Sequence, residues 1–218
     1  MPLDQLIRDK RVVVCVGSGG VGKTTIAATL ALHAASEGRR VLCMTIDPAR
    51  RLANAMGLGE MRSEMQRVGP ERFAAAGIPM AGTLDAMMLE ARRTFDELIA
   101  RHAPNATVRD RILNNRLYGF IATSLAGTQE YMAMEKLYAL RDDVRFDLLV
   151  LDTPPTPNAL DFLDAPQRMV EAIDSPATRW ISGVGLGGGL SKALGRGASF
   201  LLRALSRFTG ARFLQEVG

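Results

Sequence analysis

Apolar residues form two short continuous runs near the start of the chain. Residues 11–17 (RVVVCVG) and 40–46 (RVLCMTI) are typical of strands buried on both faces of a sheet. Residues 23–37 lie between these runs and are rich in good helix formers, and Gly38 is placed to end a helix. A strand, a helix and a strand within about 35 residues predict a right-handed βαβ unit with parallel strands.

A third apolar run, residues 146–151, ends at Asp152 and predicts another buried strand. Thr83–Leu89 is predicted as a further strand. The patterns between these runs predict helices at residues 91–102, 107–115 and 129–140. We therefore expect an α/β fold, a mostly parallel sheet flanked by helices, with a helical insertion between strands at about residues 54–141.

The pattern changes after Pro176. Residues 183–189 contain five glycines, and a helical pattern follows at about residues 190–208, with leucines on one face and basic residues on another. This basic amphipathic pattern has two interpretations: a surface for a membrane or a hydrophobic client helix, or a stripe that packs on the protein's own helices. We therefore expect a core at residues 1–178 and a separate tail at residues 179–218.

The composition narrows the class of protein. Of the 218 residues, 47% are hydrophobic and 23% are charged, as in ordinary globular domains. No apolar run reaches the roughly 18 residues that predict a membrane-spanning helix. Two cysteines without metal-ligand spacing argue against a disulfide scaffold or a zinc site and favour a cytoplasmic location, with peripheral membrane association as an open alternative. The net charge of +4 arises in the tail, so we expect no nucleic-acid partner.

Residues 17–24 (GSGGVGKT) match the phosphate-loop pattern G-x-x-x-x-G-K-[ST] at every fixed position, between a predicted strand and a predicted helix. Glycines let backbone N–H groups approach phosphate closely, and a helix N-terminus favours an anion. We expect Lys23 to contact the β- and γ-phosphates, the Thr24 hydroxyl to coordinate Mg²⁺ and Thr25 to meet the α-phosphate. The predicted nucleotide-binding residues are Gly19, Gly20, Val21, Gly22, Lys23, Thr24 and Thr25.

Two aspartates end predicted strands at the same edge of the sheet. Asp152 is the candidate Walker B residue, which holds Mg²⁺ directly or through water. Asp47 is placed to orient or deprotonate an attacking water, and together with Lys23 it forms the predicted catalytic pair. The alternative for each aspartate is a purely structural turn at the end of a strand.

Three segments together resemble the arsenical-pump, or anion-transporting, ATPase family: residues 17–25 (GSGGVGKTT), 45–53 (TIDPARRLA) and 148–163 (LLVLDTPPTPNALDFL). This family belongs to the deviant Walker A P-loop ATPases and includes cytosolic ATPases that target tail-anchored membrane proteins. The resemblance implies ATP and Mg²⁺ at the interface of a homodimer, or of a heterodimer with a homologous ATPase. It also implies two switches, matched here by residues 47–49 and 152–156, and inserted helices that bind a partner or client.

Two positions depart from the family pattern. The family loop carries a lysine that reaches the partner's nucleotide, and this chain has Ser18 there, whose hydroxyl supplies no mobile positive charge. The family's second switch usually has a glycine where this chain has Pro157, which has no N–H for a γ-phosphate. Arg50, Arg51 or a second subunit are the remaining sources of positive charge.

These patterns favour an ATP-binding, slowly hydrolysing switch that couples nucleotide state to a protein or membrane partner. Ser18 and Pro157 support an alternative, a hydrolysis-poor nucleotide-binding subunit that pairs with an active homologue. A metabolic phosphotransferase built on the same loop is a third hypothesis, which the two switch-like segments disfavour.

Overall fold

The computed structural model describes residues 3–47, 51–115 and 128–155, together with residues 118, 119, 122, 162, 164 and 167. The predictions for Pro157 and for the tail lie outside the described residues. The chain divides into two compact units, which are described separately. One comprises Met1–Glu90 and Lys136–Phe162, and the other comprises Ala91–Glu135 and Leu163–Gly218.

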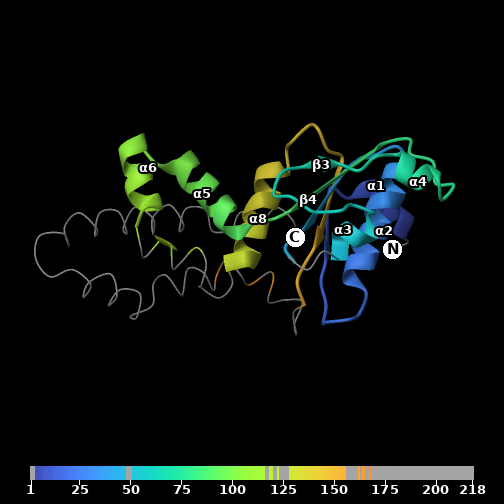
Figure 1. Ribbon diagram of the computed structural model, residues 1–218, viewed down its shortest axis with the longest axis horizontal. Helices are drawn as coiled ribbons and strands as arrows, with labels where there is room; N and C mark the ends of the chain where they lie inside the picture. The colour runs from blue at the N-terminus through green and yellow to red at the C-terminus, as the bar shows by residue number, and fades with distance from the viewer. Residues whose placement is uncertain are drawn as a thin grey trace, which may run out of the picture. The chain divides into compact units, whose positions relative to one another are not determined.

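The first unit contains a five-stranded sheet in the order β1-β5-β2-β4-β3 (Figure 1). Its strands are β1 (Val12–Cys15), β2 (Arg40–Thr45), β3 (Gln66–Arg67), β4 (Thr83–Met88) and β5 (Leu148–Asp152). The first four in spatial order are parallel, and β3 pairs antiparallel with β4. The mostly parallel α/β fold is therefore confirmed, and the two-residue strand β3 is the strand of this sheet that the sequence did not predict.

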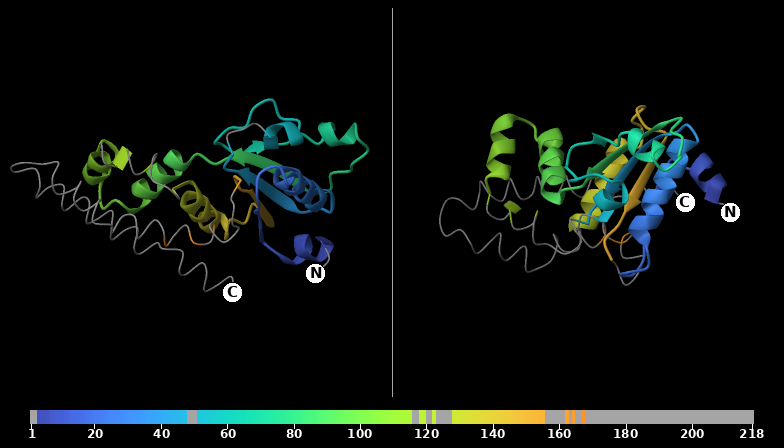
Figure 2. Two further views of the ribbon diagram at one scale, coloured as in Figure 1. Left: turned by 90° about the horizontal axis from the view of Figure 1, so that it is seen from below. Right: turned by 45° about the vertical axis from the view of Figure 1, so that its right-hand side comes forward.

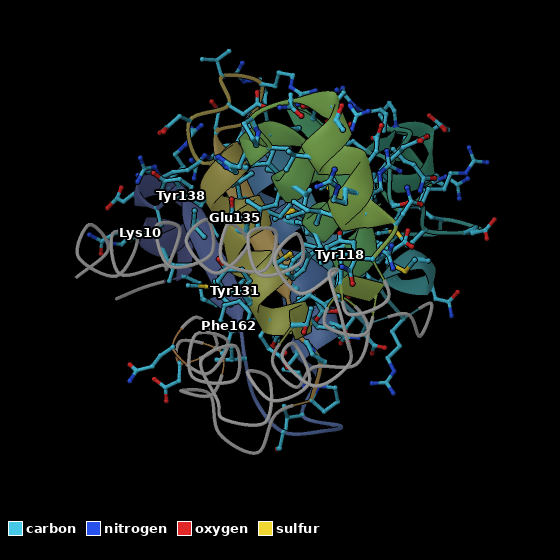
Figure 3. All side chains as sticks on the ribbon, turned by 90° about the vertical axis from the view of Figure 1, so that its left-hand side faces the viewer. Lys10, Tyr118, Tyr131, Glu135, Tyr138 and Phe162 are labelled. Atoms are coloured by element: carbon cyan, nitrogen blue, oxygen red, sulfur yellow. The ribbon has the colours of Figure 1, made fainter. Side chains whose placement is uncertain are left out.

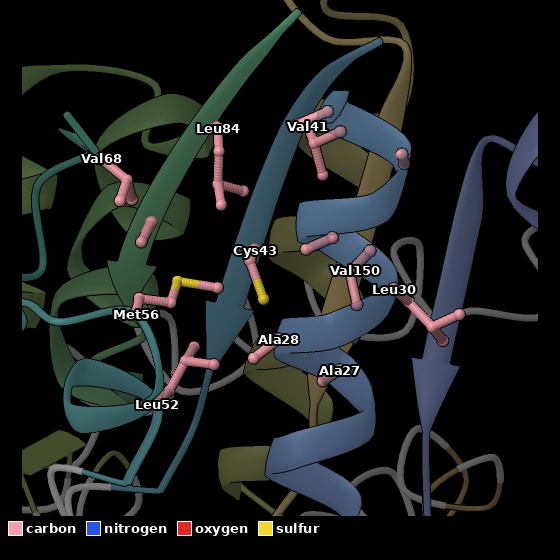
Figure 4. Packing of buried hydrophobic residues seen from close by; sticks show 14 of the residues in the cluster. Ala27, Ala28, Leu30, Val41, Cys43, Leu52, Met56, Val68, Leu84 and Val150 are labelled. Carbon is pink, nitrogen blue, oxygen red and sulfur yellow. The ribbon is translucent and has the colours of Figure 1, made fainter. Parts of the chain in front are cut away.

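Helix α2 (Lys23–Ser36) packs across the sheet, and its buried side is almost entirely alanine (Figure 4). Ala27 and Ala31 are fully buried and belong to one core cluster with Cys43 and Val150 of the strands. Figure 4 shows Cys43 and Val150 on the side of the sheet that α2 covers. Alanine has no side chain beyond Cβ, so the helix backbone lies close to the sheet. Leu149, on the opposite face, is also fully buried, which explains why the strand sequences are apolar without alternation.

A Schellman motif ends α2, as Gly38 predicts. The Gly38 N–H donates to the Ala35 carbonyl at 3.2 Å, and the Arg39 N–H donates to the Ala34 carbonyl at 3.0 Å. Gly38 adopts φ +94°, which a residue with a Cβ rarely adopts. This turn leads the chain directly into β2, so a short connection places β2 beside α2.

Two arginines make contacts at the amino-terminal ends of the strands. Arg11 donates to the backbone carbonyls of Asp143 and Phe146, both at 2.9 Å. Arg40 makes a two-pronged contact with the Asp147 carboxylate, at 2.6 and 3.0 Å. These contacts fix the segment that leads into β5. They therefore also fix the position of the carboxyl end of β5.

Three short helices of the first unit were not predicted from the sequence. They are α1 (Leu3–Asp9), α3 (Arg51–Ala55) and α4 (Glu71–Ala74). Helix α1 contacts α2 and buries Ile7 in the core (Figure 2). Helices of four to seven residues carry too few turns to show a helical period in the sequence, which is why they escaped prediction.

The second unit contains helices α5 (Ala91–His102) and α6 (Ala106–Leu113) and the first part of α8 (Thr128–Leu140). All three were predicted. Phe95 packs edge-to-face on Tyr118, with ring centroids 5.5 Å apart, and the Tyr118 hydroxyl donates to Asp96. Tyr131 and Glu135 lie one turn apart on α8, and both are buried (Figure 3). Among the described helices, none is long and apolar enough to span a bilayer.

Candidate nucleotide-binding site

The phosphate loop connects β1 to α2 and has the backbone that its glycines predict. Gly20 and Gly22 adopt φ +78° and +88°, in the left-handed region that side chains disfavour. Gly22 is the N-cap of α2, and no side chain caps the helix there. The first N–H groups of this 14-residue helix are thus left to an anion, which the helix dipole also attracts.

Lys23 folds back over the loop. Its Nζ donates to the Ser18 carbonyl oxygen at 2.8 Å. An ammonium group has three N–H donors, so this contact positions the charge above the loop and leaves capacity for phosphate oxygens. The Ser18 side chain at the loop tip is exposed, as are Val21 and Thr25.

Strand register brings Asp152 to the phosphate loop. Asp152, the last residue of β5, is paired with Cys15 of β1 on one side and with Thr45 of β2 on the other. In-register neighbours point to the same face of a sheet, which here is the face covered by α2. The Thr24 hydroxyl, at the start of α2, donates to Asp152 Oδ2 at 2.9 Å, and the Thr45 hydroxyl donates to the same oxygen at 3.2 Å.

The other Asp152 oxygen is unsatisfied. Oδ1 is buried and has no hydrogen-bond partner among the described residues. Burial raises the pKa of the Asp152 carboxyl, and the hydrogen bonds from Thr24 and Thr45 partly oppose this rise. A buried carboxylate oxygen beside a threonine hydroxyl is the hard oxygen donor set that Mg²⁺ prefers, so the residues fit this ion.

Asp47 lies just beyond β2 at the same edge. Its backbone N–H donates to the Thr45 hydroxyl at 3.1 Å, and its carboxylate lies 3.6 Å from Arg51. Asp47 lines a cavity of about 220 Å³ together with both polar and apolar residues. The remaining lining residues are Thr45, Leu52, Ala53, Glu60, Met61 and Met88.

The segment after β5 lies against the loop. The Thr153 hydroxyl donates to the Cys15 carbonyl at 2.7 Å, which ties this segment to the end of β1. A Cβ placed on Gly19 would lie 3.8 Å from the Pro155 side chain. A shift of either segment would therefore change its contacts with the other.

The structure thus brings together Lys23, Thr24, Asp47 and Asp152, whose grouping the sequence predicted from their positions at strand and helix ends. Thr45 was not predicted as a site residue. Its signal was weak: a hydroxyl at the end of the apolar run RVLCMT, two residues before Asp47. Residues 48 and 49 of the first switch, Arg50, and Thr156 of the second switch lie outside the described residues.

Comparison with known proteins identifies the family. Residues 10–179 match the family described as Anion-transporting ATPase. The chain belongs to this family. Its sheet and phosphate loop are accordingly those of a P-loop NTPase, and the resemblance stated from the sequence is confirmed.

Individual relatives are similar at modest identity. ATPase GET3 of Malassezia globosa is 28% identical over 161 residues, which cover 74% of this chain and 44% of that protein. ATPase get3 of Aspergillus terreus is 29% identical over 160 residues, covering 72% of this chain and 43% of that protein. ATPase ASNA1 homolog 1 of Paramecium tetraurelia is 28% identical over 158 residues, covering 72% and 44%. The chain spans less than half the length of these curated relatives.

Proposed function

We propose that this chain binds ATP together with Mg²⁺, hydrolyses it slowly, and changes its contacts with a protein or membrane partner according to the bound nucleotide. The observation that carries the proposal is the contact between the Thr24 hydroxyl and Asp152 Oδ2 beside an uncapped helix N-terminus. It joins a phosphate-binding loop to a buried carboxylate, which is the arrangement that binding of a metal–triphosphate complex requires.

Each residue has a distinct role in this proposal. The loop N–H groups and Lys23 bind the phosphate oxygens, and Thr24 and Asp152 hold Mg²⁺ directly or through water. When bound, Mg²⁺ neutralises charge on the β- and γ-phosphates. The Asp47 carboxylate orients the attacking water or accepts its proton. Turnover is expected to be slow, because the described part of the site offers few positive charges to stabilise the transition state.

Family membership and the two switch segments support a role as a switch. Asp47, which begins the first of these segments, is bound to Thr45 at the end of β2, and the second segment, which begins at Asp152, lies against the loop. Loss of the γ-phosphate would therefore be felt by both. We propose a homodimer, or a heterodimer with a homologous ATPase, as the working form, and a hydrophobic client helix or a membrane surface as the partner. We expect it to act in the cytoplasm.

Nucleotide titration tests the site directly. We expect the wild type to bind ATP more tightly with Mg²⁺ than with EDTA, measured by calorimetry, and Lys23→Ala to weaken binding by roughly tenfold or more, since it removes a charge from the phosphates. Lys10→Ala is the matched control, because Lys10 is exposed and precedes β1, at the end of that strand opposite the loop. Equal affinities of Lys23→Ala and Lys10→Ala would contradict the site assignment, and a parallel titration with GTP decides the base preference.

A second candidate function is favoured by Ser18. The family's lysine at this position is replaced by an exposed serine whose carbonyl, not its hydroxyl, contacts Lys23. A chain of this kind would bind nucleotide without efficient turnover and would depend on a homologous subunit for the missing charge. Faster hydrolysis by Ser18→Lys alone would support this function, whereas an unchanged rate would count against it.

A further inference from the structure

We propose that Thr45 is a positioning residue that couples the metal-holding carboxylate of Asp152 to the water-orienting residue Asp47. This inference rests on the function proposed above. It arises from one hydroxyl group that contacts both residues, and neither the motifs nor the family comparison assigns Thr45 a role.

The direction of each hydrogen bond follows from the groups involved. The Asp47 backbone N–H is only a donor, so the Thr45 oxygen accepts in their 3.1 Å contact. The Asp152 carboxylate is only an acceptor, so the Thr45 hydroxyl proton points to Oδ2 at 3.2 Å. A hydroxyl has one proton and two lone pairs, so both bonds form at once and run in one direction.

The Thr24 hydroxyl completes this chain of contacts. It donates to Asp152 Oδ2 at 2.9 Å, so a single oxygen accepts from α2 and from β2. The orientation of the Asp152 carboxylate is thereby fixed from two sides, which leaves Oδ1 for the metal or its water. Through Thr45, the same oxygen also fixes where the chain turns away from β2 to begin the first switch.

The strand backbone holds Thr45 independently of its hydroxyl. Its carbonyl accepts from the Leu89 N–H at 2.7 Å, and the next residue, Ile46, donates to the Asp152 carbonyl at 3.3 Å. The residue is 2% exposed. Removing the hydroxyl while keeping the side-chain shape should therefore leave β2 in place and release only the Asp47 N–H and one contact to Asp152.

The Asp47 carboxylate would then be held less firmly. The carboxylate pairs with Arg51 at 3.6 Å, but the Arg51 side chain is 60% exposed, and ion pairs of such exposure hold geometry weakly. Small displacements of a positioned catalytic group slow a reaction much more than they weaken binding of the phosphates. The loss should consequently appear in kcat rather than in nucleotide affinity.

The test compares Thr45→Val with Thr45→Ser, and uses Thr94→Val as the matched control. Valine keeps the shape and removes the hydroxyl, whereas serine keeps the hydroxyl. Thr94 is a buried threonine on α5, in the other unit. For each protein we would measure Mg²⁺–ATP affinity by calorimetry and single-turnover hydrolysis of γ-labelled ATP with protein in excess.

We expect Thr45→Val to bind Mg²⁺–ATP within about threefold of the wild type and to hydrolyse it roughly tenfold or more slowly. Thr45→Ser and Thr94→Val should both hydrolyse ATP within about twofold of the wild type. The inference is overturned if Thr45→Val retains the wild-type rate, if its affinity falls as much as its rate, or if Thr45→Ser is equally slow.

Two further outcomes separate this inference from the function on which it rests. A wild type that binds no Mg²⁺–ATP refutes the proposed function before any variant is compared. A wild type that binds but never hydrolyses overturns the role of Thr45 and leaves nucleotide binding standing. If Thr45→Val fails to unfold cooperatively, Thr45→Cys replaces it, because its sulfur occupies the place of the hydroxyl oxygen and hydrogen-bonds only weakly. Wild-type turnover by Thr45→Cys would then overturn the inference.

Discussion

Asp152 and Asp147 lie at opposite ends of β5, and their substitution by asparagine should change stability in opposite directions. Asp152 is 1% exposed, and one of its oxygens has no partner among the described residues. Burying a carboxylate costs several kcal/mol, and two hydroxyl donors return about 1.5–3 kcal/mol each. In the absence of Mg²⁺ we therefore expect Asp152→Asn to raise the free energy of unfolding by about 1–2 kcal/mol at pH 7.

The direction of the pKa shift of Asp152 determines how the stability difference depends on pH. Burial raises the folded-state pKa of Asp152 above the unfolded value of about 4, so the folded protein holds the proton more tightly. The cost of the charge is complete above the folded-state pKa and disappears as the pH falls towards 4. The gain of Asp152→Asn over the wild type should consequently be largest at neutral pH and vanish near pH 4.

Asp147 provides the control of opposite sign. Hydrogen bonds from Arg40 lower the pKa of Asp147 to about 2. A depressed carboxyl pKa stabilises the fold above the unfolded value of about 4, and this stability is lost as the pH falls through 2. A two-unit shift corresponds to about 2.6 kcal/mol, but the Asp147 side chain is 34% exposed, so we expect Asp147→Asn to cost about 1 kcal/mol at pH 7.

Urea denaturation in EDTA at pH 4 to 8 measures both variants. A saturating Mg²⁺–ATP arm completes the experiment, since ligand at about 100 times its Kd stabilises a protein by about 2.7 kcal/mol. The wild type should gain this stability and Asp152→Asn should lose most of it. The reasoning is refuted if Asp152→Asn is less stable than the wild type in EDTA, or if it keeps the full gain from Mg²⁺–ATP.

Two further predictions follow from the packing around α2. Ala31→Leu should destabilise the first unit by about 1–3 kcal/mol in urea denaturation, because Ala31 is fully buried against the sheet and a larger side chain has no space. A variant that unfolds at the same urea concentration as the wild type would contradict this packing. The Cys15 thiol should resist a thiol-specific reagent at pH 8 in the native protein and react once the protein is denatured. Burial raises the pKa of this thiol to about 11, which leaves on the order of 0.1% of it as thiolate. Fast labelling of native Cys15 would contradict this prediction.

The sequence predicted a structural feature correctly where a single residue type meets a local requirement of the backbone or of burial. Continuous apolar runs identified three of the four parallel strands, β1, β2 and β5, because strands covered on both faces need no polar side. Gly38 identified the end of α2 because the turn there needs a positive φ. The two-residue strand β3 escaped because it is held by the partner strand β4 and an Arg67–Asp85 ion pair, neither of which leaves a periodic pattern.

The same distinction explains what was found and missed in the site. Lys23, Thr24 and Asp152 are marked by the loop pattern and by the end of an apolar run, so local sequence was sufficient. Thr45 depends on register: only the pairing of β2 with β5 places its hydroxyl beside Asp152. A one-residue slip would turn that hydroxyl to the opposite face of the sheet, and no local pattern specifies the pairing of strands about 100 residues apart.

Under the proposed function, the site carries an energetic cost that Mg²⁺–ATP would relieve. Its helix N-terminus lacks a side-chain cap, its loop uses left-handed glycines, and Asp152 Oδ1 is buried without a partner among the described residues. The uncapped N–H groups and the buried oxygen lower the stability of the protein, and under the proposed function an anion and a cation would satisfy them. Because Thr45 connects Asp152 to Asp47, the relief extends to the start of the first switch. Stability in urea with and without Mg²⁺–ATP therefore reports on the same contacts that position Asp47, and a Thr45→Val protein should keep most of this stabilisation while losing turnover.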